Sequence, residues 1–403
     1  MVMAFGHSET RVRDPLTGRE AIKEGAVMAA DTPQARTGDG AIDQARVQEF
    51  AGRLMETFTH GVAGLIIDLA GRSGLLEALA AGPGTSEQLA DRAGLHERYV
   101  REILGALVTS RIVTFDPSSG TYLLPAEHAL CLTRGSPVNM APLARLNTLL
   151  AKHVEGVERA CREGGGIPYD AYRPEFTEIM DGLSRGTLDT HLLQDMLPLA
   201  GQLPVRLADG IRVADVGCGT GHALNLMARA YPRSTFVGYD LAPDALDAAR
   251  REAAGLGLAN TTFEMLDGTR LPIDPPFDAV FAFDTIHDLA DPVTTLARIH
   301  RALVPGGVFV MVDIKASSRL QENLDIPWAP WLYGVSTLHC LTVSLSQRGA
   351  GLGTVWGEQV ARHMLADAGF VQIDVHDVPD DPFDSVYVAH TPAADQPSRF
   401  VGG

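Results

Sequence analysis

Residues 213–221 read VADVGCGTG, and this stretch decides the fold. Four residues suited to a buried β-strand run into a turn with glycine at positions 217, 219 and 221, and a helical pattern follows at residues 223–230. Glycine has no Cβ, so such a turn lets a ligand approach the backbone closely. The spacing lacks the extra residue of the dinucleotide-binding fingerprint, and no GxxxxGK[ST] phosphate loop occurs. The stretch therefore predicts a strand, a glycine-rich turn and a helix at which a ligand meets the backbone.

An alternation of strand and helix patterns continues from this stretch. Apolar runs with strand character follow one another at residues 213–216, 235–239, 262–266, 279–283 and 308–313. The clearest helical patterns between them lie at residues 243–256 and 292–303. Two later runs, at 371–375 and 385–389, are too close together for a crossover helix and indicate an antiparallel pair at the sheet edge. We predict an α/β fold with a seven-stranded, mostly parallel, Rossmann-like sheet over residues 206–391.

Acidic residues stand at the ends of the predicted strands. Asp240 ends the second strand, Asp267 follows the third, and the pair His287-Asp288 follows the fourth. Ligands of open α/β sheets bind beyond the carboxyl ends of the strands, where a carboxylate can accept both hydroxyls of a ribose. Each acid taken alone could equally cap a helix or lie in a solvated loop. Their recurrence at successive strand ends favours a binding site.

A second domain precedes the sheet. Residues 41–135 give a helix, a helix-turn-helix spacing and a short hairpin, which together predict a winged helix in a mainly helical domain. This stretch holds 8 Arg and no Lys against 11 Asp plus Glu, a net charge of -3. A module that reads DNA is normally more basic, so dimerisation or substrate capping is favoured over DNA binding. Residues 136–205 form a helical connector, and residues 1–40 and 392–403 predict disordered tails.

Composition limits the function classes. The 403 residues carry 33 basic and 50 acidic side chains, a net charge of -17, which disfavours nucleic acid and anionic membranes as partners. No apolar run reaches the roughly 18 residues of a membrane span, and the four cysteines form no CxxC pair. The N-terminus lacks the order of a secretory signal. We expect a cytoplasmic protein with reduced thiols.

The motifs resemble those of class I S-adenosylmethionine (SAM)-dependent methyltransferases. They read VADVGCGTG (213–221), VGYD (237–240), MLDG (265–268), FDAVFAFDTIHD (277–288) and LVPGGVFVMVD (303–313). The resemblance implies that the three glycines cradle the methionine part of SAM, that Asp240 holds the ribose and that Asp267 holds the adenine. It implies further cofactor contacts at Asp215, Leu241, Gly268 and Phe283, with Asp215 fixing the loop or meeting the methionine ammonium.

A winged helix ahead of this fold resembles the small-molecule O-methyltransferases and bacterial winged-helix methyltransferases of unassigned substrate. The resemblance implies a homodimer and makes His287 the general base for a substrate hydroxyl, with Asp288 beside it and Asp313 or Glu358 as its orienting acid. With a reference pKa of about 6.5, a histidine is expected to be largely neutral at pH 7. The family often continues His-Asp with Trp, whereas Leu289 stands here.

Catechol-type enzymes of the same fold hold a metal at acids after the fourth and fifth strands. The corresponding positions here are Asp284, Asp288 and Asp313. That subfamily has Asp-Asn after the fifth strand, whereas this chain has Asp313-Ile314. We therefore predict that no metal is bound.

Aromatic residues in the insertion after the fifth strand predict the acceptor pocket. The candidates are Trp328, Trp331, Tyr333 and His339, with Tyr169 and Tyr172 of the connector as weaker ones. Aromatic walls suit a planar or apolar acceptor, although the same rings could simply pack a domain interface.

The sequence thus predicts SAM-dependent methyl transfer to a small-molecule hydroxyl, as in secondary metabolism. The alternative is a ligand-sensing transcriptional regulator that reads DNA through Arg92, Arg98 and Arg101. A protein or nucleic-acid methyltransferase is a third possibility. The identity of the acceptor and the choice among O-, N- and C-methylation stay open.

Overall fold

The computed structural model describes residues 6–13, 20–27, 42–136, 138–379 and 381–394. The chain divides into two units, residues 1–58 and 59–403. The first unit contains strands β1 (Gly6–Arg13) and β2 (Glu20–Val27), which pair antiparallel, and the start of the long helix α1 (Gln44–Arg72). The sequence predicted a disordered tail over residues 1–40; the described part of it holds this strand pair, and the other residues lie outside the described ranges.

The second unit begins with the end of α1 and continues as a winged helix. Its elements are α2 (Leu75–Ala80), α3 (Ser86–Ala93), α4 (Glu97–Thr109), β3 (Thr114–Asp116), β4 (Thr121–Leu123) and α5 (Ala126–Leu132). Thr85 begins α3 with a capping box shared with Gln88, and Gly94 ends that helix at a φ of 67°. Leucines from α2, α3 and α4 bury their side chains together in a small core.

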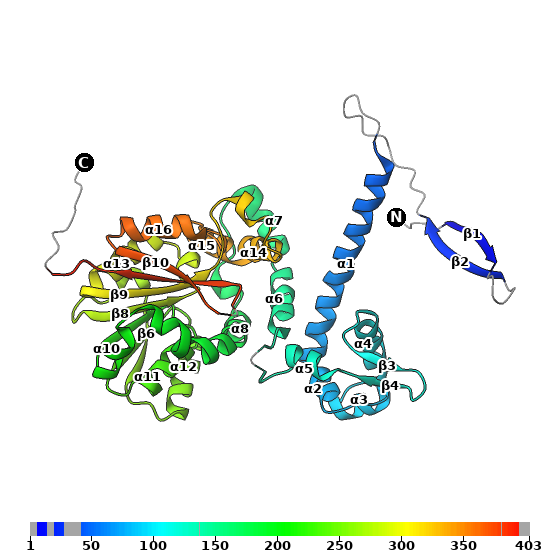
Figure 1. The fold of residues 1–403 in the computed structure, drawn as a ribbon, viewed down its shortest axis with the longest axis horizontal. Helices are drawn as coiled ribbons and strands as arrows, with labels where there is room; N and C mark the ends of the chain where they lie inside the picture. The colour runs from blue at the N-terminus through cyan, green and yellow to red at the C-terminus, as the bar shows by residue number, and fades with distance from the viewer. Residues whose placement is uncertain (1–5, 14–19, 28–41, 137, 380, 395–403) are drawn as a thin grey trace. The chain divides into compact units, whose positions relative to one another are not determined.

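A seven-stranded sheet forms the larger part of this unit (Figure 1). In spatial order its strands are β10 (Val371–Asp377), β11 (Asp384–His390), β9 (Leu303–Ile314), β8 (Phe277–Phe283), β5 (Arg212–Val216), β6 (Thr235–Asp240) and β7 (Thr261–Met265). Only β11 pairs antiparallel with both of its neighbours, and the other adjacent strands are parallel. This arrangement confirms the predicted fold class, including the antiparallel edge pair.

Two hydrophobic cores lie on opposite faces of the sheet because consecutive strand residues point to opposite sides. In β5, Val213 joins the core formed with α10 (Leu203–Asp209), α11 (His222–Ala230) and α12 (Pro243–Gly255). The next residue, Ala214, joins the core formed with α13 (Pro292–Ala302) and α16 (Gly357–Asp367). Both faces are therefore covered, which leaves the strand ends as the place for a ligand.

The connector and the late insertion pack against each other. The connector contains α6 (Ala141–Ala151), α7 (Val154–Glu163), η1 (Tyr169–Ala171), α8 (Glu175–His191), the π-helical η2 (Leu192–Met196) and α9 (Leu197–Leu199). The insertion contains η5 (Leu320–Asn323), α14 (Ala329–Val335), the π-helical η6 (Ser336–Cys340) and α15 (Leu341–Ser346).

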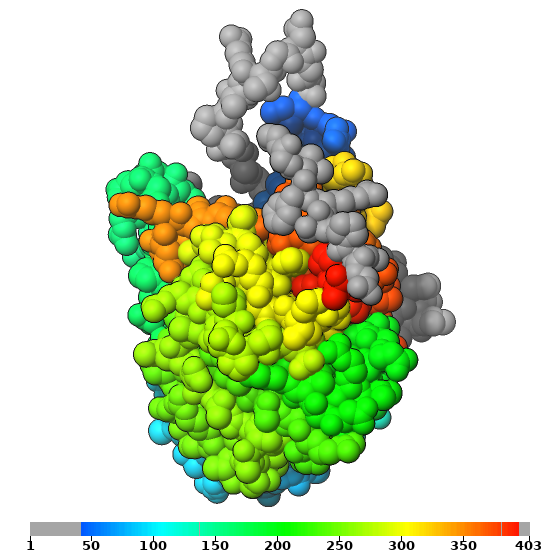
Figure 2. All heavy atoms as spheres, turned by 90° about the vertical axis from the view of Figure 1, so that its left-hand side faces the viewer, coloured from blue at the N-terminus to red at the C-terminus, as the bar shows by residue number. Residues whose placement is uncertain are grey.

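A shared core and a backbone contact hold these two segments together. Tyr172 and Phe176 of the connector and Val335 and Cys340 of the insertion belong to one hydrophobic cluster. The backbone of Gly166 passes so close to Thr342 that a side chain there would collide with it. In Figure 2 the orange insertion lies directly against the blue-green connector. Among the described residues, no helix is both long and apolar enough for a transmembrane segment.

Candidate active site

The glycine-rich turn follows β5 at the centre of the sheet. Its glycines at 217, 219 and 221 have φ values of 74°, 51° and 68°, a region that side chains rarely adopt. A Cβ at Gly217 would collide with Thr285, and one at Gly221 would lie 2.5 Å from the Phe263 ring. A Cβ at Gly219 would meet nothing within 4 Å, so this residue faces open space. The turn is thus tight on the protein side and open where a ligand can approach.

Asp240, at the end of β6, is tied to the turn. Its carboxylate accepts hydrogen bonds from the backbone N–H groups of Gly219 and Ala242, both at 2.8 Å. Burial raises the pKa of Asp240, while these backbone donors act in the opposite direction. Each carboxylate oxygen keeps a second lone pair, so Asp240 can still accept the hydroxyls of a ribose.

The remaining predicted cofactor residues have varied environments. Asp267 begins the short 3-10 helix η3 (Gly268–Arg270), where one of its oxygens accepts from the backbone and hydroxyl of Thr269 at 2.8 and 2.7 Å. Its other oxygen accepts no hydrogen bond from a described residue. Gly268 is buried, Leu241 is exposed, and Phe283 stacks on Phe281 with ring centroids 5.9 Å apart.

Asp215 is a buried carboxyl group with an unused oxygen. The residue is 1% exposed, and its Oδ1 atom has no hydrogen-bond partner among the described residues. Burial, and then the charge of Asp240, raises the pKa of Asp215 to about 8. The group is therefore mainly protonated at pH 7, and a cationic ligand placed beside it would favour its charged form.

His287 forms the clearest catalytic arrangement. It lies in the 3-10 helix η4 (Ile286–Asp288) directly after β8 and is 4% exposed. Its Nδ1 is 2.7 Å from Asp313 Oδ1 at the end of β9, and its Nε2 is 3.4 Å from Asp288 Oδ1. Asp313 also accepts from the indole of Trp356 at 3.1 Å. A buried carboxylate that fixes one ring nitrogen sets the orientation of the imidazole, as an oriented general base requires.

The charge of His287 differs from the sequence-based expectation. Burial lowers its pKa, but the carboxylates of Asp313 and Asp288 raise it by more, so the pKa lies well above its ordinary value. The expectation of a largely neutral histidine is therefore wrong for the chain alone. The sequence could not predict this charge, because only the fold brings the carboxylates of Asp313 and Asp288 close to the two ring nitrogens.

Three of the predicted pocket residues come together near this histidine. His339 is fully buried and stacks on Phe176, with ring centroids 3.7 Å apart. Tyr172 and Tyr169 meet the same imidazole edge-on at 4.7 and 6.0 Å. His339 Nδ1 lies 3.8 Å from Asp288 Oδ2, which connects this aromatic cluster to the His287 site. Burial lowers the pKa of His339 to about 4, so the ring is neutral.

The other predicted pocket residues, Trp331, Trp328 and Tyr333, do not stack on His339 but make other contacts. Trp331 packs at the border of the cluster and donates from its indole to Asn147 Oδ1 at 3.0 Å. Trp328 packs against Phe383 at 5.2 Å, and the Tyr333 hydroxyl accepts from Asn323 at 3.1 Å. These contacts match the packing alternative. Glu358, the other candidate for orienting His287, instead accepts from Arg362 at 2.6 Å.

A potential cation-binding group differs from the one considered from sequence. His287, Asp288 and Cys340 offer ligand-type atoms within 4.8 Å of one another, the one group of this kind among the described residues. Burial raises the pKa of the Cys340 thiol to about 12, and its sulfur accepts from the Thr354 hydroxyl at 2.9 Å. The absence of a bound metal stays a prediction.

Sequence reasoning missed Phe176 and Trp356. Both are buried aromatic residues in segments without a recognisable motif. Phe176 had a weak signal as part of an aromatic group with Tyr169 and Tyr172. Trp356 had none, because its contact with Asp313 joins positions 43 residues apart.

The chain is similar to known proteins in both of its predicted domains. A family model described as a methyltransferase domain matches residues 207–328, and one described as an Rv2258c-like winged HTH domain matches residues 61–134. The ubiquinone/menaquinone biosynthesis C-methyltransferase of Desulfotalea psychrophila is 31% identical over 172 residues, which are 41% of this chain and 67% of that protein. The demethylspheroidene O-methyltransferase of Rhodobacter capsulatus is 27% identical over 319 residues, 74% of this chain and 72% of that one.

A solved structure extends the likeness to most of the chain. Human N-acetylserotonin methyltransferase in complex with SAM has a TM-score of 0.66 at 18% identity, covering 89% of this chain and all of that one. At this identity the likeness concerns the fold. The matched regions cover between 40% and 72% of the length of the curated relatives.

The environment of Asp215 predicts a measurable pH dependence of stability. Between the unfolded pKa of about 3.9 and the folded pKa of about 8, the folded chain holds a proton that the unfolded chain has lost, so stability falls as pH rises. Between pH 6 and pH 8, we expect the wild type to lose about 2 kcal/mol of unfolding free energy relative to Asp215→Asn. Denaturant unfolding of both proteins at the two pH values measures this difference.

Other buried acids contribute equally to both proteins and cancel in the comparison. Asp209→Asn, which changes an exposed carboxylate, serves as the control and should follow the wild type. Parallel pH profiles for wild type and Asp215→Asn would show that the Asp215 proton is not retained in the fold.

Proposed function

Since this chain belongs to the SAM-dependent methyltransferases, we propose that it methylates a hydroxyl group of a small molecule, with His287 as the general base. The observation that carries the proposal is the position of His287 at the end of β8, held through Nδ1 by the buried Asp313. We further propose that the other parts of the chain hold SAM, enclose the acceptor and form a dimer.

The residues around the glycine-rich turn fit SAM. When bound, SAM supplies an electrophilic methyl group and a net positive charge. Gly219 offers open space for a close approach, Asp240 offers lone pairs for a ribose, and the unpartnered Oδ1 of Asp215 suits an ammonium group. Asp267, Gly268, Leu241 and Phe283 are proposed to border the adenine part.

His287 is proposed to remove the hydroxyl proton through Nε2. Asp313 accepts from the Nδ1 side, which sets the ring orientation and stabilises the imidazolium formed when the proton arrives. The raised pKa makes His287 a strong base but keeps it protonated in the chain alone. A cationic cofactor nearby would lower that pKa and release the proton before the acceptor reacts.

The aromatic cluster is proposed as the wall of the acceptor site. Phe176 and Tyr169 pack against the neutral His339, whose Nδ1 lies 3.8 Å from Asp288 Oδ2 beside His287. Such surfaces favour a planar or largely apolar acceptor, consistent with secondary metabolism. Nucleic acid is a poor candidate because the chain carries a net charge of -17.

The regulator alternative has little support from the proposed DNA-reading arginines. Arg98 and Arg101 pair with Glu102 and Glu97 of their own helix, α4. Arg92 donates to backbone carbonyls of Ala78 and Gly82. All three guanidinium groups already have protein partners, and the carboxylates beside Arg98 and Arg101 would repel DNA phosphates.

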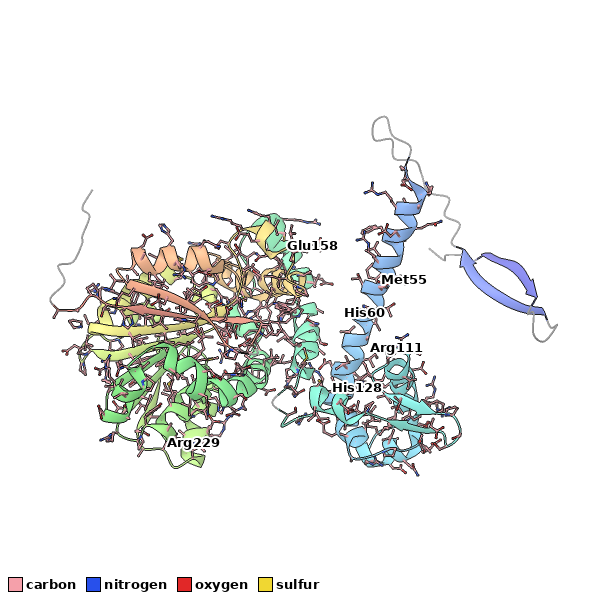
Figure 3. All side chains as sticks on the ribbon, in the orientation of Figure 1. Met55, His60, Arg111, His128, Glu158 and Arg229 are labelled. Atoms are coloured by element: carbon pink, nitrogen blue, oxygen red, sulfur yellow. The ribbon has the colours of Figure 1, made fainter. Side chains whose placement is uncertain are left out.

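A homodimer is proposed through helix α1. Its apolar residues recur at alternating steps of three and four, which places them on one face. Five of them are between 45% and 63% exposed, namely Met55, Phe58, Val62, Leu65 and Leu69. Met55 is labelled on this helix in Figure 3. An uninterrupted apolar stripe of this length is typical of a helix that packs against another chain.

Replacing His287 tests the chemistry. We expect His287→Ala to lower the transfer of label from methyl-labelled SAM to a host metabolite extract by about 10²–10⁴-fold, without weakening SAM binding, because the variant loses a charged ring that would repel a cationic cofactor. Asp313→Asn should also reduce transfer, because its amide no longer carries the charge that stabilises the imidazolium. Scintillation counting of small-molecule, protein and nucleic-acid fractions, with calorimetry for SAM binding, measures both quantities.

Preserved transfer in His287→Ala would remove its role as a base. Label in the protein or nucleic-acid fraction would change the acceptor class. Binding of SAM without transfer to any fraction, together with salt-sensitive binding to promoter DNA, would favour the regulator.

Charged substitutions on α1 test the dimer. We expect the wild type to sediment as a dimer and the double variant Val62→Glu/Leu65→Glu as a monomer, because two exposed apolar positions of the stripe become charged. Leu130→Glu on α5 is the matched control, since Leu130 is 56% exposed and lies outside the stripe. Sedimentation velocity distinguishes the two states, and a wild-type monomer would refute the proposed interface.

A further inference from the structure

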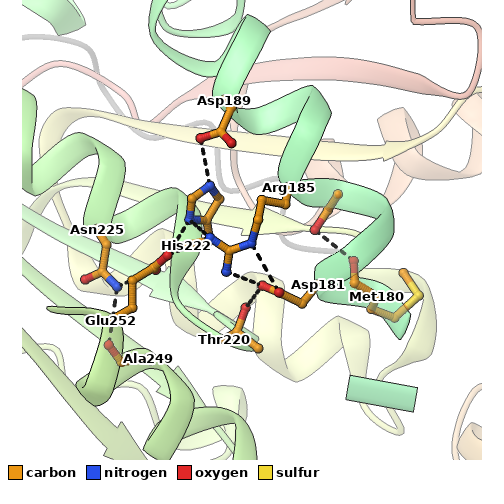
Figure 4. Close-up of polar contacts among 10 residues, drawn as sticks. Met180, Asp181, Arg185, Asp189, Thr220, His222, Asn225, Ala249 and Glu252 are labelled. Carbon is orange, nitrogen blue, oxygen red and sulfur yellow. Dashed lines mark hydrogen bonds and ion pairs between the residues drawn. The ribbon is translucent and has the colours of Figure 1, made fainter. Parts of the chain in front are cut away.

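Helix α8 reaches from the aromatic cluster to the glycine-rich turn. Phe176, near its start, stacks on His339, and Asp181 and Arg185, one and two turns further on, contact the turn and the start of α11 (Figure 4). Residues four apart lie on the same helix face, so Asp181, Arg185 and Asp189 form one polar row. The cofactor motif itself predicted none of these contacts.

Asp181 binds the turn directly. The Thr220 hydroxyl donates to Asp181 Oδ1 at 2.6 Å, a bond between residues 39 positions apart. Thr220 stands between Gly219 and Gly221, so its position affects the part of the turn that faces the ligand. Arg185 holds the Asp181 carboxylate from the other side through Nε and Nη2 at 3.2 and 2.7 Å. The Asp181 carboxylate, which accepts the Thr220 hydrogen bond, therefore has a fixed orientation.

Arg185 extends the network to α11 and α12. Its Nη1 donates to Glu252 Oε1 at 2.6 Å and lies 2.8 Å from His222 Nδ1. The same His222 Nδ1 lies 2.9 Å from Glu252 Oε1, and His222 Nε2 lies 3.0 Å from Asp189 Oδ1. Although burial alone would raise the pKa of Glu252, bonds from His222, Arg185 and Asn225 lower it to about 2. The carboxylate thus stays charged and anchors Arg185.

We propose that α8 is a positioning element that fixes the cofactor turn through Asp181 and Arg185 and couples cofactor binding to the acceptor pocket through Phe176. None of these side chains is assigned to the reacting atoms. The inference rests on the family's SAM site and, for the acceptor side, on the proposed function, which makes the aromatic cluster the acceptor wall. It does not rest on the identity of the acceptor or on His287 acting as a base.

The coupling follows from a shared rigid helix. A turn held in its binding conformation loses less conformational freedom when the ligand arrives, so the Thr220–Asp181 bond favours SAM binding. When SAM orders the glycine-rich turn, the Thr220–Asp181 bond restrains α8 as well. The stack of Phe176 on His339 then restrains η6. SAM binding should therefore order the acceptor wall before an acceptor is present.

Paired substitutions at Thr220 test the first link. Thr220→Val removes the hydroxyl at similar volume, and we expect it to weaken the affinity for SAM and for S-adenosylhomocysteine by about tenfold. Thr220→Ser keeps the hydroxyl and should bind nearly as well as the wild type. Asp181→Ala removes the acceptor on α8 without altering the sequence of the turn and should weaken binding as Thr220→Val does. Isothermal titration calorimetry measures the affinities.

A control separates positioning from general stability. Glu102→Gln removes the exposed ion pair with Arg98 in the winged helix and should leave ligand affinity unchanged. Melting temperatures without ligand show whether any variant is simply unfolded. Equal affinities for wild type, Thr220→Val and Asp181→Ala would overturn the proposed role of α8 in cofactor binding.

Hydrogen exchange tests the coupling. In the wild type, saturating S-adenosylhomocysteine should slow amide exchange in residues 217–221, 175–191 and 336–340. Asp181→Ala, also at saturation, should keep the protection of the turn and lose the ligand-dependent protection of α8 and η6. Phe176→Leu should keep the protection of the turn and α8 and lose that of η6. If α8 had only a structural role, the two variants would not lose ligand-dependent protection in this stepwise pattern.

The outcomes distinguish this inference from the proposed function. Ligand-independent exchange of α8 in the wild type would refute the coupling, whatever the methyl-transfer assay gives. A failure of methyl transfer to hydroxyls, with affinities and exchange as expected, would refute only the proposed reaction.

Discussion

The buried carboxylate of Asp313 is the constraint on which the catalytic side of the structure depends. It is fully buried, and its Oδ1 receives His287, the Trp356 indole and the backbone N–H of Ile314. A charge removed from water costs several kcal/mol unless charged or polar partners replace the lost hydration. His287 in its charged form supplies the strongest compensation, so β8, β9 and the start of α16 are held together by the same atoms that would move a proton.

Several buried acidic residues lie near the carboxyl ends of the strands, and they lower the stability of the fold. Asp215 and Asp284 both have raised pKa values, about 8 and 7, chiefly because they are buried, and both keep an oxygen without a partner among the described residues. Such groups are unfavourable in the empty chain and favourable once a cation arrives. Ligand binding then stabilises the fold as well as filling the site, a common consequence of building a site from strained or unsatisfied groups.

The sequence was sufficient for most of the fold and for the position of the glycine-rich turn, because both depend on local patterns. Period-two apolar runs and the glycines at 217, 219 and 221 define strands and a turn without reference to distant residues. The aromatic cluster depends on contacts between segments far apart, so Phe176 was missed, while Trp328 and Tyr333 make their contacts with Phe383 and Asn323. The charge of His287 required knowing two neighbours that only the fold supplies.

The π-helical segment η6 has an evolutionary consequence. A π turn contains one more residue than the α turn it replaces, and η6 carries His339 and Cys340, which face the Asp288 region. Deleting one residue there would restore the α-helical course and change which side chains of η6 face Asp288, while the flanking helices keep their orientation. A single-codon deletion or insertion could thus exchange the residues that face an acceptor, while the glycine-rich turn stays intact. Acceptor range and cofactor use can therefore diverge independently among descendants of this fold.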